Sequence, residues 1–132
     1  MNSILYIKDV DKKGRGVFSA IPYTVEQIIE TCPLLIFRAD DFEPMKSTFI
    51  LNYCFLFDQA ENLVCLATGF GSLYNHSSPA NARHKVNKEE RTVSIIAVRE
   101  IAAHEEICIN YHGDFDSTST IWFTSKGIEY HP

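Results

Sequence analysis

The chain has 132 residues and carries 12 Lys and Arg against 17 Asp and Glu, a formal net charge of −5 at pH 7. This length suits one domain with a modest core, and 45% hydrophobic with 22% charged residues is typical of a soluble globular protein. The acidic balance argues against direct nucleic-acid binding, which needs a basic face, and is compatible with a basic protein partner.

The first third of the chain is predicted as short strands separated by turns. Residues 11–16 form a polar, glycine-containing turn cluster. Pro33 interrupts an apolar, β-branched stretch, which suits an edge strand or a bend. Extended segments are expected at residues 4–7, 17–20, 27–32 and 34–37.

Further along, residues 40–45 are predicted as a loop, and the aromatic-rich residues 47–57 end as a strand after a first half that could be a helical turn. More strands are expected at residues 63–67, 92–98 and 107–111. No long helix is signalled. Many short strands separated by turns predict a mostly-β fold with long-range pairing.

The four cysteines lie in apolar stretches and form no C-x-x-C pair that would indicate structural zinc. They are Cys32, Cys54, Cys65 and Cys108. Because free cysteine is commonly buried, we expect buried thiols and no metal site. We also expect no membrane association and a cytoplasmic or nuclear location, since the sequence has neither a bilayer-length apolar run nor a signal-peptide pattern.

Three features at the ends of these elements could bind a ligand, and each also has a local explanation. The glycines of Gly14-Arg15-Gly16 permit positive φ and close approach to the main chain, but such pairs are usually hairpin turns. Asn75 and His76 suit an irregular polar turn. Tyr111 ends an apolar strand, where a tyrosine by default sits at the rim with its hydroxyl in water.

Taken together, these features have the order of a known family. Tyr74-Asn75-His76-Ser77 is followed by Asn81-Ala82-Arg83-His84, then by Glu105-Glu106-Ile107, with Tyr111 four residues on. In this order and spacing, the chain resembles the SET-domain protein lysine methyltransferases over about residues 3–115. Its length and the Asn-Ala-Arg-His run are most similar to the minimal viral SET proteins.

The resemblance implies a mostly-β SET fold (β-clip) of several short sheets, in which the C-terminal part threads under the Asn-His turn in a knot-like core. Residues 1–132 would form a single SET domain, with residues 116–132 as a lid or plug. S-adenosylmethionine would bind on one face, and the substrate lysine would enter from the other.

The same match assigns roles to individual residues. Gly14, Arg15 and Gly16 would present main-chain groups to the methionine end of the cofactor. Asn75 and His76 would hold its amine and adenine. Tyr111 would be the catalytic residue, with its hydroxyl close to the methyl group and the incoming nitrogen.

The substrate channel implied by the resemblance would be lined by Tyr53, Tyr74, Ile109 and Phe115. For Tyr53 and Phe115, plain core packing is an equally good explanation. An apolar channel and a nearby sulfonium charge would both lower the pKa of the lysine from about 10.4. A strong general base is then not required.

The sequence departs from the family in two turns and at the C-terminus. Glu26 and His104 stand where glycine is usual, and positive φ would cost about 1 kcal/mol at each; we expect these turns to be rebuilt. No cysteine-rich zinc module follows the core. Trp122 could stack on the adenine or close the channel, residues 121–123 could be a hydrophobic plug, or a second subunit of a homodimer could complete the site.

The function implied is S-adenosylmethionine-dependent methyl transfer to a lysine of a basic protein such as a histone. The main alternative is a SET-fold module that has lost catalysis and serves binding or scaffolding. A β-barrel-like ligand-binding protein with accidental motifs is a third possibility. Binding of S-adenosylhomocysteine would separate the first from the others.

Overall fold

The computed structural model describes residues 4–42, 53–58 and 60–110. This part of the chain contains nine strands and one short helix. They are β1 Leu5–Val10, β2 Gly14–Ser19, β3 Ile28–Arg38, α1 Ala39–Phe42, β4 Cys54–Asp58, β5 Leu63–Ala67, β6 Asn75–His76, β7 Ala82–Asn87, β8 Thr92–Ala97 and β9 Glu106–Ile109. The mostly-β prediction is therefore confirmed.

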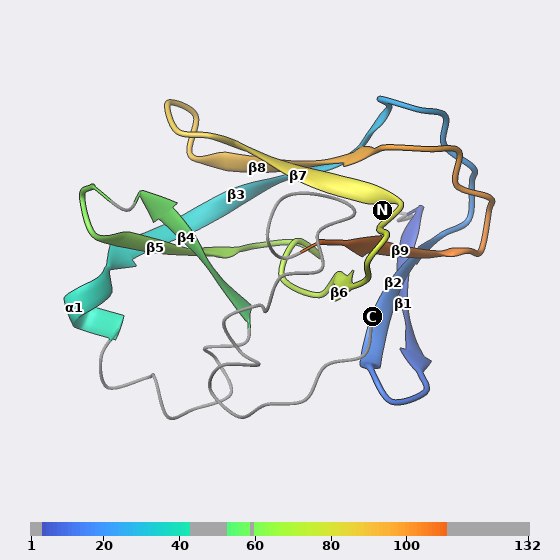
Figure 1. The fold of residues 1–132 in the computed structure, drawn as a ribbon, viewed down its shortest axis with the longest axis horizontal. Coiled ribbons are helices and arrows are strands. Elements are labelled where there is room, and N and C mark those ends of the chain that lie inside the picture. Colours follow the sequence, from blue (N-terminus) through green and yellow to red (C-terminus); the bar gives the residue numbers. More distant parts are fainter. Residues whose placement is uncertain (1–3, 43–52, 59, 111–132) are drawn as a thin grey trace.

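The strands form two sheets, with orders β1-β2-β9-β6 and β4-β5-β3-β8-β7 (Figure 1). Both sheets contribute to the main core cluster, which lies between them. Its buried members are Leu5, Val17, Tyr23, Tyr74, Ala82, Ile95, Ala97, Ile101, Ile107 and Ile109. Strands far apart in the sequence thus share one apolar interior. The knot-like threading stays a prediction because it involves residues beyond 110.

The β1–β2 hairpin explains the first glycine. Its pairing runs from Leu5↔Ser19 to Val10↔Gly14, so β2 begins at Gly14 and the turn is shorter than predicted. Gly14 has φ 76°, and Lys12 in the turn has φ 66°. The three loop residues 11–13 are thus followed by a left-handed glycine, a conformation that glycine adopts without steric cost.

Strand β3 runs without interruption through Pro33, so the predicted break there is wrong. Residues up to Pro33 pair with β8, and residues from Leu34 onward pair with β5. Pro33 thus stands where the strand changes neighbours, and a residue without an N–H is tolerated at such a position. Its carbonyl still accepts hydrogen bonds from Thr68 N at 3.0 Å and Thr68 Oγ1 at 2.7 Å.

Three elements were missed by sequence reasoning. Strand β6 at Asn75–His76 was predicted as an irregular polar turn. Helix α1 occupies part of the predicted loop at 40–45, of which residues 43–45 lie outside the described residues. Strand β7 has the polar sequence ARHKVN and carries no strand signal of its own. It forms because its main chain pairs with β8 from Ala82↔Ala97 to Asn87↔Thr92.

All four cysteines are free and buried, as predicted. Burial, followed by the charge of Glu30, raises the pKa of the Cys32 thiol to about 12. Burial likewise raises the pKa of Cys108 to about 12. These thiols therefore stay protonated at neutral pH and serve as small core side chains.

The expectation that the two non-glycine turns are rebuilt is wrong. Glu26 has φ 70° and His104 has φ 66°, so both keep the left-handed backbone. Each has compensating hydrogen bonds. Glu26 N donates to Ala97 O at 2.8 Å and its carboxylate pairs with Arg83 at 3.1 Å, while His104 Nδ1 lies 2.7 Å from the Tyr6 hydroxyl. Such contacts can offset a strain of about 1 kcal/mol per residue.

Among the described residues, no helix has the length and apolar character needed to cross a membrane.

Candidate functional site

The short strand β6 brings the predicted motifs together. Asn75 and His76 pair in parallel with Cys108 and Ile109 of β9. Strand β9 also pairs with β2, the strand that begins at Gly14. The glycine turn, the Asn-His pair and the strand that leads toward Tyr111 therefore lie side by side in one sheet (Figure 1).

Four residues at this junction form a polar cluster, which we call the glycine-turn cluster: Lys13, Gly16, Asn75 and Glu106. Asn75 Nδ2 donates to Glu106 Oε2 at 2.7 Å and to the carbonyl of Arg15 at 3.2 Å. Lys13 Nζ lies 3.8 Å from Glu106 Oε1, and only 17% and 16% of these two side chains are exposed. An ammonium and a carboxylate thus stand next to an amide at the turn.

Gly16 is required at this point for reasons of space. A Cβ there would overlap Glu106 Oε2 and come within 2.9 Å of Val10 Cγ2 and 3.1 Å of Asn75 Nδ2. No atom lies within 4 Å of a Cβ built on Gly14. Glycine is favoured at this position because of its positive φ. The two glycines of the motif therefore serve different purposes, one for close approach and one for the turn.

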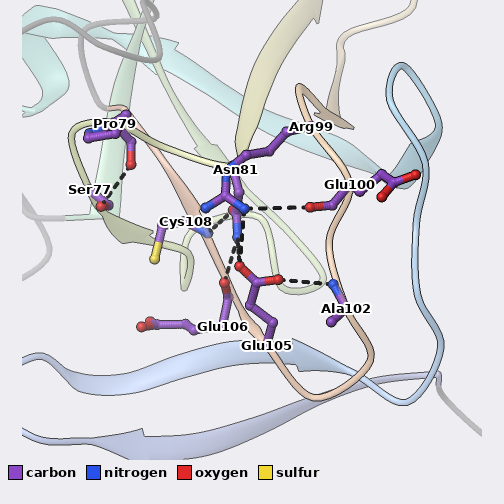
Figure 2. A network of polar contacts seen from close by, with 9 residues as sticks. All are labelled: Ser77, Pro79, Asn81, Arg99, Glu100, Ala102, Glu105, Glu106 and Cys108. Carbon is purple, nitrogen blue, oxygen red and sulfur yellow. Dashed lines mark hydrogen bonds and ion pairs between the residues drawn. The ribbon is translucent and has the colours of Figure 1, made fainter.

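Asn81 anchors β9 in the position that the cluster needs. Its Nδ2 donates to the carbonyl of Glu106 at 2.8 Å, and its Oδ1 accepts from Cys108 N at 2.8 Å. Its own carbonyl accepts from Val98 N at 3.0 Å. Figure 2 shows the amide between these groups, and the residue is only 3% exposed. The buried Asn81 side chain thus pairs with one carbonyl and one N–H of the β9 main chain.

Glu105 closes the same network from the turn before β9 (Figure 2). Its Oε1 accepts from Ala102 N at 2.9 Å, and its Oε2 lies 3.3 Å from Arg99 NH1. Partial burial acts to raise the pKa of Glu105, but the hydrogen bonds from Ala102, Asn81 and Arg99 outweigh it and hold the pKa below its usual range. The carboxylate therefore stays charged and fixes the turn.

Tyr74 and His76 of the Tyr-Asn-His-Ser motif are buried at 1% and 5% exposure. The Tyr74 hydroxyl donates to Glu30 Oε1 at 2.7 Å, and Phe70 N donates to Glu30 Oε2 at 3.0 Å. Burial, followed by the negative charge of Glu30, raises the pKa of Tyr74. In the described structure Tyr74 ties the loop after β5 to β3, and its place in the substrate channel stays a prediction.

The other described residues of the predicted channel differ in exposure. Ile109 is fully buried, whereas Tyr53 is 40% exposed. Tyr111, Phe115 and Trp122 lie outside the described residues, so their roles stay predictions.

Sequence reasoning missed Lys13 and Glu106 as members of the site. Glu106 stood in the Glu-Glu-Ile motif without a role, and no local pattern distinguishes Lys13 from other turn lysines. Glu106 is placed beside Asn75 by the parallel pairing of β6 with β9. That pairing is known only from the fold, so the sequence carried no signal for Glu106.

Comparison with known proteins identifies the family. Residues 14–112 match the SET domain. The chain belongs to the SET-domain family. It is 34% identical over 127 residues to a histone-lysine N-methyltransferase specific for H3 lysine-37 from Schizosaccharomyces pombe, with 96% of this chain and 81% of that protein covered.

Solved structures agree on the fold. A Plasmodium falciparum protein described as a candidate histone methyltransferase matches with a TM-score of 0.64 at 24% identity, covering 93% of this chain and 99% of that one. A humanized mutant of the Chaetomium thermophilum Polycomb Repressive Complex 2 matches with a TM-score of 0.69 at 16% identity, covering 89% of this chain and 16% of that one. The predicted SET fold is confirmed.

Proposed function

We propose that this chain is a protein-lysine N-methyltransferase that uses S-adenosylmethionine and acts on a histone-like protein. The observation that carries the proposal is the junction of the glycine turn, Asn75-His76 and β9 in one sheet. The likeness to a histone-lysine methyltransferase supports the substrate class, as does the opposite charge of a basic substrate and a chain of net charge −5.

The residues present fit the methionine end of the cofactor, which carries an ammonium and a carboxylate. Glu106 offers a carboxylate to the ammonium, and Lys13 offers an ammonium to the carboxylate. The Asn75 amide donates hydrogen bonds both to the Glu106 carboxylate and to the carbonyl of Arg15 in the turn. The missing Cβ of Gly16 leaves the room that the Glu106 carboxylate and the Asn75 amide occupy beside the turn. The donor set therefore matches a zwitterionic group.

When bound at Lys13, Asn75 and Glu106, the cofactor would supply an electrophilic methyl group for transfer to the lysine nitrogen. The task of the chain is to position and desolvate the two partners. Asn81 and the β6–β9 pairing hold the cluster in place. We assign to the Tyr111 hydroxyl the role of an oxygen directed at the methyl group, through weak C–H···O contacts.

The location and assembly of the protein follow as further parts of the proposal. A histone substrate implies that the protein works in the nucleus. A homodimer would provide a second subunit to close the site, and analytical ultracentrifugation of the purified chain tests for it.

The first experiment is calorimetric titration of the folded chain with S-adenosylhomocysteine. We expect saturable one-site binding that Asn75→Ala abolishes and that Asn87→Ala, an exposed asparagine in the β7–β8 hairpin, leaves intact. No binding at millimolar ligand would overturn the cofactor assignment and favour a binding module.

The second experiment tests Tyr111→Phe with recombinant histones and radiolabelled cofactor. Methyl transfer should fall sharply, while affinity for S-adenosylhomocysteine stays within a factor of about three, since the hydroxyl acts mainly in the transition state. An equally steep loss of cofactor affinity would show that Tyr111 has a structural role instead.

A further inference from the structure

A carboxylate on the inner face of β3 makes two hydrogen bonds to the segment that leads into β6. Glu30 Oε1 accepts from the Tyr74 hydroxyl at 2.7 Å, and Glu30 Oε2 accepts from Phe70 N at 3.0 Å. Tyr74 is 1% exposed. Burial, followed by the negative charge of Glu30, raises the pKa of Tyr74, so its hydroxyl keeps its proton and remains a donor. The contact joins β3 to a segment 44 residues further along the chain.

A β-bulge in β3 turns this carboxylate inward. The register with β8 shifts by one residue between Ile28 and Glu30, and Glu30 therefore lies opposite Ile95, which is 1% exposed. Alternate residues of a regular strand face the same side. Without the bulge, Glu30 would point outward with Ile28, which is 58% exposed. Bulges are common next to active sites, where they redirect a side chain.

The loop between β5 and β6 fits closely around Glu30 and the neighbouring thiol of Cys32. A Cβ on Gly69 would lie 2.6 Å from Glu30 Oε2, and a Cβ on Gly71 would lie 2.9 Å from Cys32 Sγ. The loop is also tied within itself, since Gly71 N donates to Thr68 O at 3.1 Å. Because the main chain approaches the carboxylate so closely, a shift of Glu30 displaces the loop as a unit.

Strand β6, which follows this loop, depends on contacts at both of its ends. It has only two residues, and Tyr74 directly precedes it. On its far side, Ser77 N donates to Ile109 O at 3.0 Å. Between these two anchors, Asn75 Nδ2 has to reach Glu106 Oε2, 2.7 Å away. The hydroxyl of Tyr74 is therefore the side-chain anchor on the near side of the cofactor-facing residues.

We propose that Glu30 is a positioning residue for the cofactor site, which acts through the Tyr74 hydroxyl to hold Asn75 and His76 in place. This inference rests on the proposed function. Glu30 itself contacts neither cofactor nor substrate in this arrangement, and its effect is on the geometry of β6. Loss of the Glu30–Tyr74 contact therefore weakens cofactor binding although every cofactor-facing side chain is still present. Because the two residues act through one hydrogen bond, the effects of replacing them do not add.

The first test contains no ligand. Hydrogen exchange of backbone amides, followed by NMR in the folded chain, should show the Ser77 amide exchanging about tenfold faster in Tyr74→Phe than in the wild type, the effect of one hydrogen bond. The Leu34 amide, which donates to Arg91 O at 2.9 Å in another part of the fold, should keep its rate. Equal acceleration of both amides would indicate general destabilisation and overturn the inference, as would an unchanged Ser77 rate.

Calorimetric titration with S-adenosylhomocysteine provides the second test. Tyr74→Phe should raise the Kd about tenfold, Glu30→Ala should raise it at least as much, and the double variant should bind no more weakly than Glu30→Ala alone. Glu30→Gln, which keeps an acceptor oxygen, should recover part of the loss. The matched control is Tyr6→Phe, whose lost hydroxyl lies 2.7 Å from His104 Nδ1 and which should leave the Kd unchanged.

Two results of the titration would overturn the inference: losses that add in the double variant, and Kd values equal to that of the wild type in both single variants. If the wild-type chain itself does not bind S-adenosylhomocysteine, the proposed function fails. The exchange experiment, which needs no ligand, still decides in that case whether the Glu30–Tyr74 contact holds β6 in place.

Discussion

Replacing Asn81 by alanine should destabilise the chain far more than replacing an exposed asparagine. The change removes the two hydrogen bonds of 2.8 Å that the side chain makes to the main chain of Glu106 and Cys108. Because the site is 3% exposed, water cannot simply replace the amide. Each main-chain group left unpaired costs about 1–3 kcal/mol, so we expect a loss of about 2–6 kcal/mol. Domains of this size have about 5–15 kcal/mol of stability in total.

Urea unfolding followed by circular dichroism measures this loss. With a urea slope of about 1–3 kcal/mol/M, the midpoint should fall by at least about 0.7 M. The matched control is Asn87→Ala, which removes one exposed hydrogen bond from Glu90 N at 3.0 Å and should cost at most about 1 kcal/mol. Equal losses for the two variants would refute the idea that Asn81 holds β9 in place.

Three further predictions concern other parts of the molecule. Gly16→Ala should weaken binding of S-adenosylhomocysteine at least about tenfold in calorimetry, because the new Cβ forces Glu106 out of its place; unchanged affinity would remove the turn from the cofactor site. The folded-state pKa of Glu105 is lowered, so its contribution to stability is complete above the unfolded value of about 4.3 and is lost as the pH falls through the folded value. Glu105→Gln should therefore flatten the acid limb of the unfolding free energy, and a limb of unchanged slope would show that other carboxylates dominate it. The four cysteines are buried, so iodoacetamide at pH 8 should label them only after unfolding in urea, since the thiolate is the reactive form; rapid labelling of the folded chain would contradict their burial.

Turn chemistry and strand patterns were the parts of the fold that the sequence predicted well. The β1–β2 hairpin follows from Gly14, whose positive φ is a local demand. The strands at residues 63–67 and 92–98 carry enough apolar and β-branched side chains to be recognised alone. Strand β7 could not be recognised because its stability comes from pairing with β8 and not from its own polar side chains.

Tertiary neighbours overrode local preference at Pro33, Glu26 and His104. Proline predicts a break, yet β3 continues because its pairing passes to another strand at that residue. The two residues with positive φ predict rebuilt turns, yet each turn keeps its shape through hydrogen bonds to distant residues. A local rule gives the cost of such a position, and only the fold shows what offsets it.

The sequence by itself determined the mostly-β class, the membership in the SET-domain family and the order of the motifs, because these are properties that can be read along the chain. Only the tertiary structure decided which side chains meet. Asn75 contacts Arg15 and Glu106 across 60 and 31 residues, and Lys13 joins them through a hairpin. A small pocket beside His84 likewise depends on side chains that six strands bring together. Contacts between distant residues arise from the register and pairing of whole strands, and no local pattern of residue types specifies them.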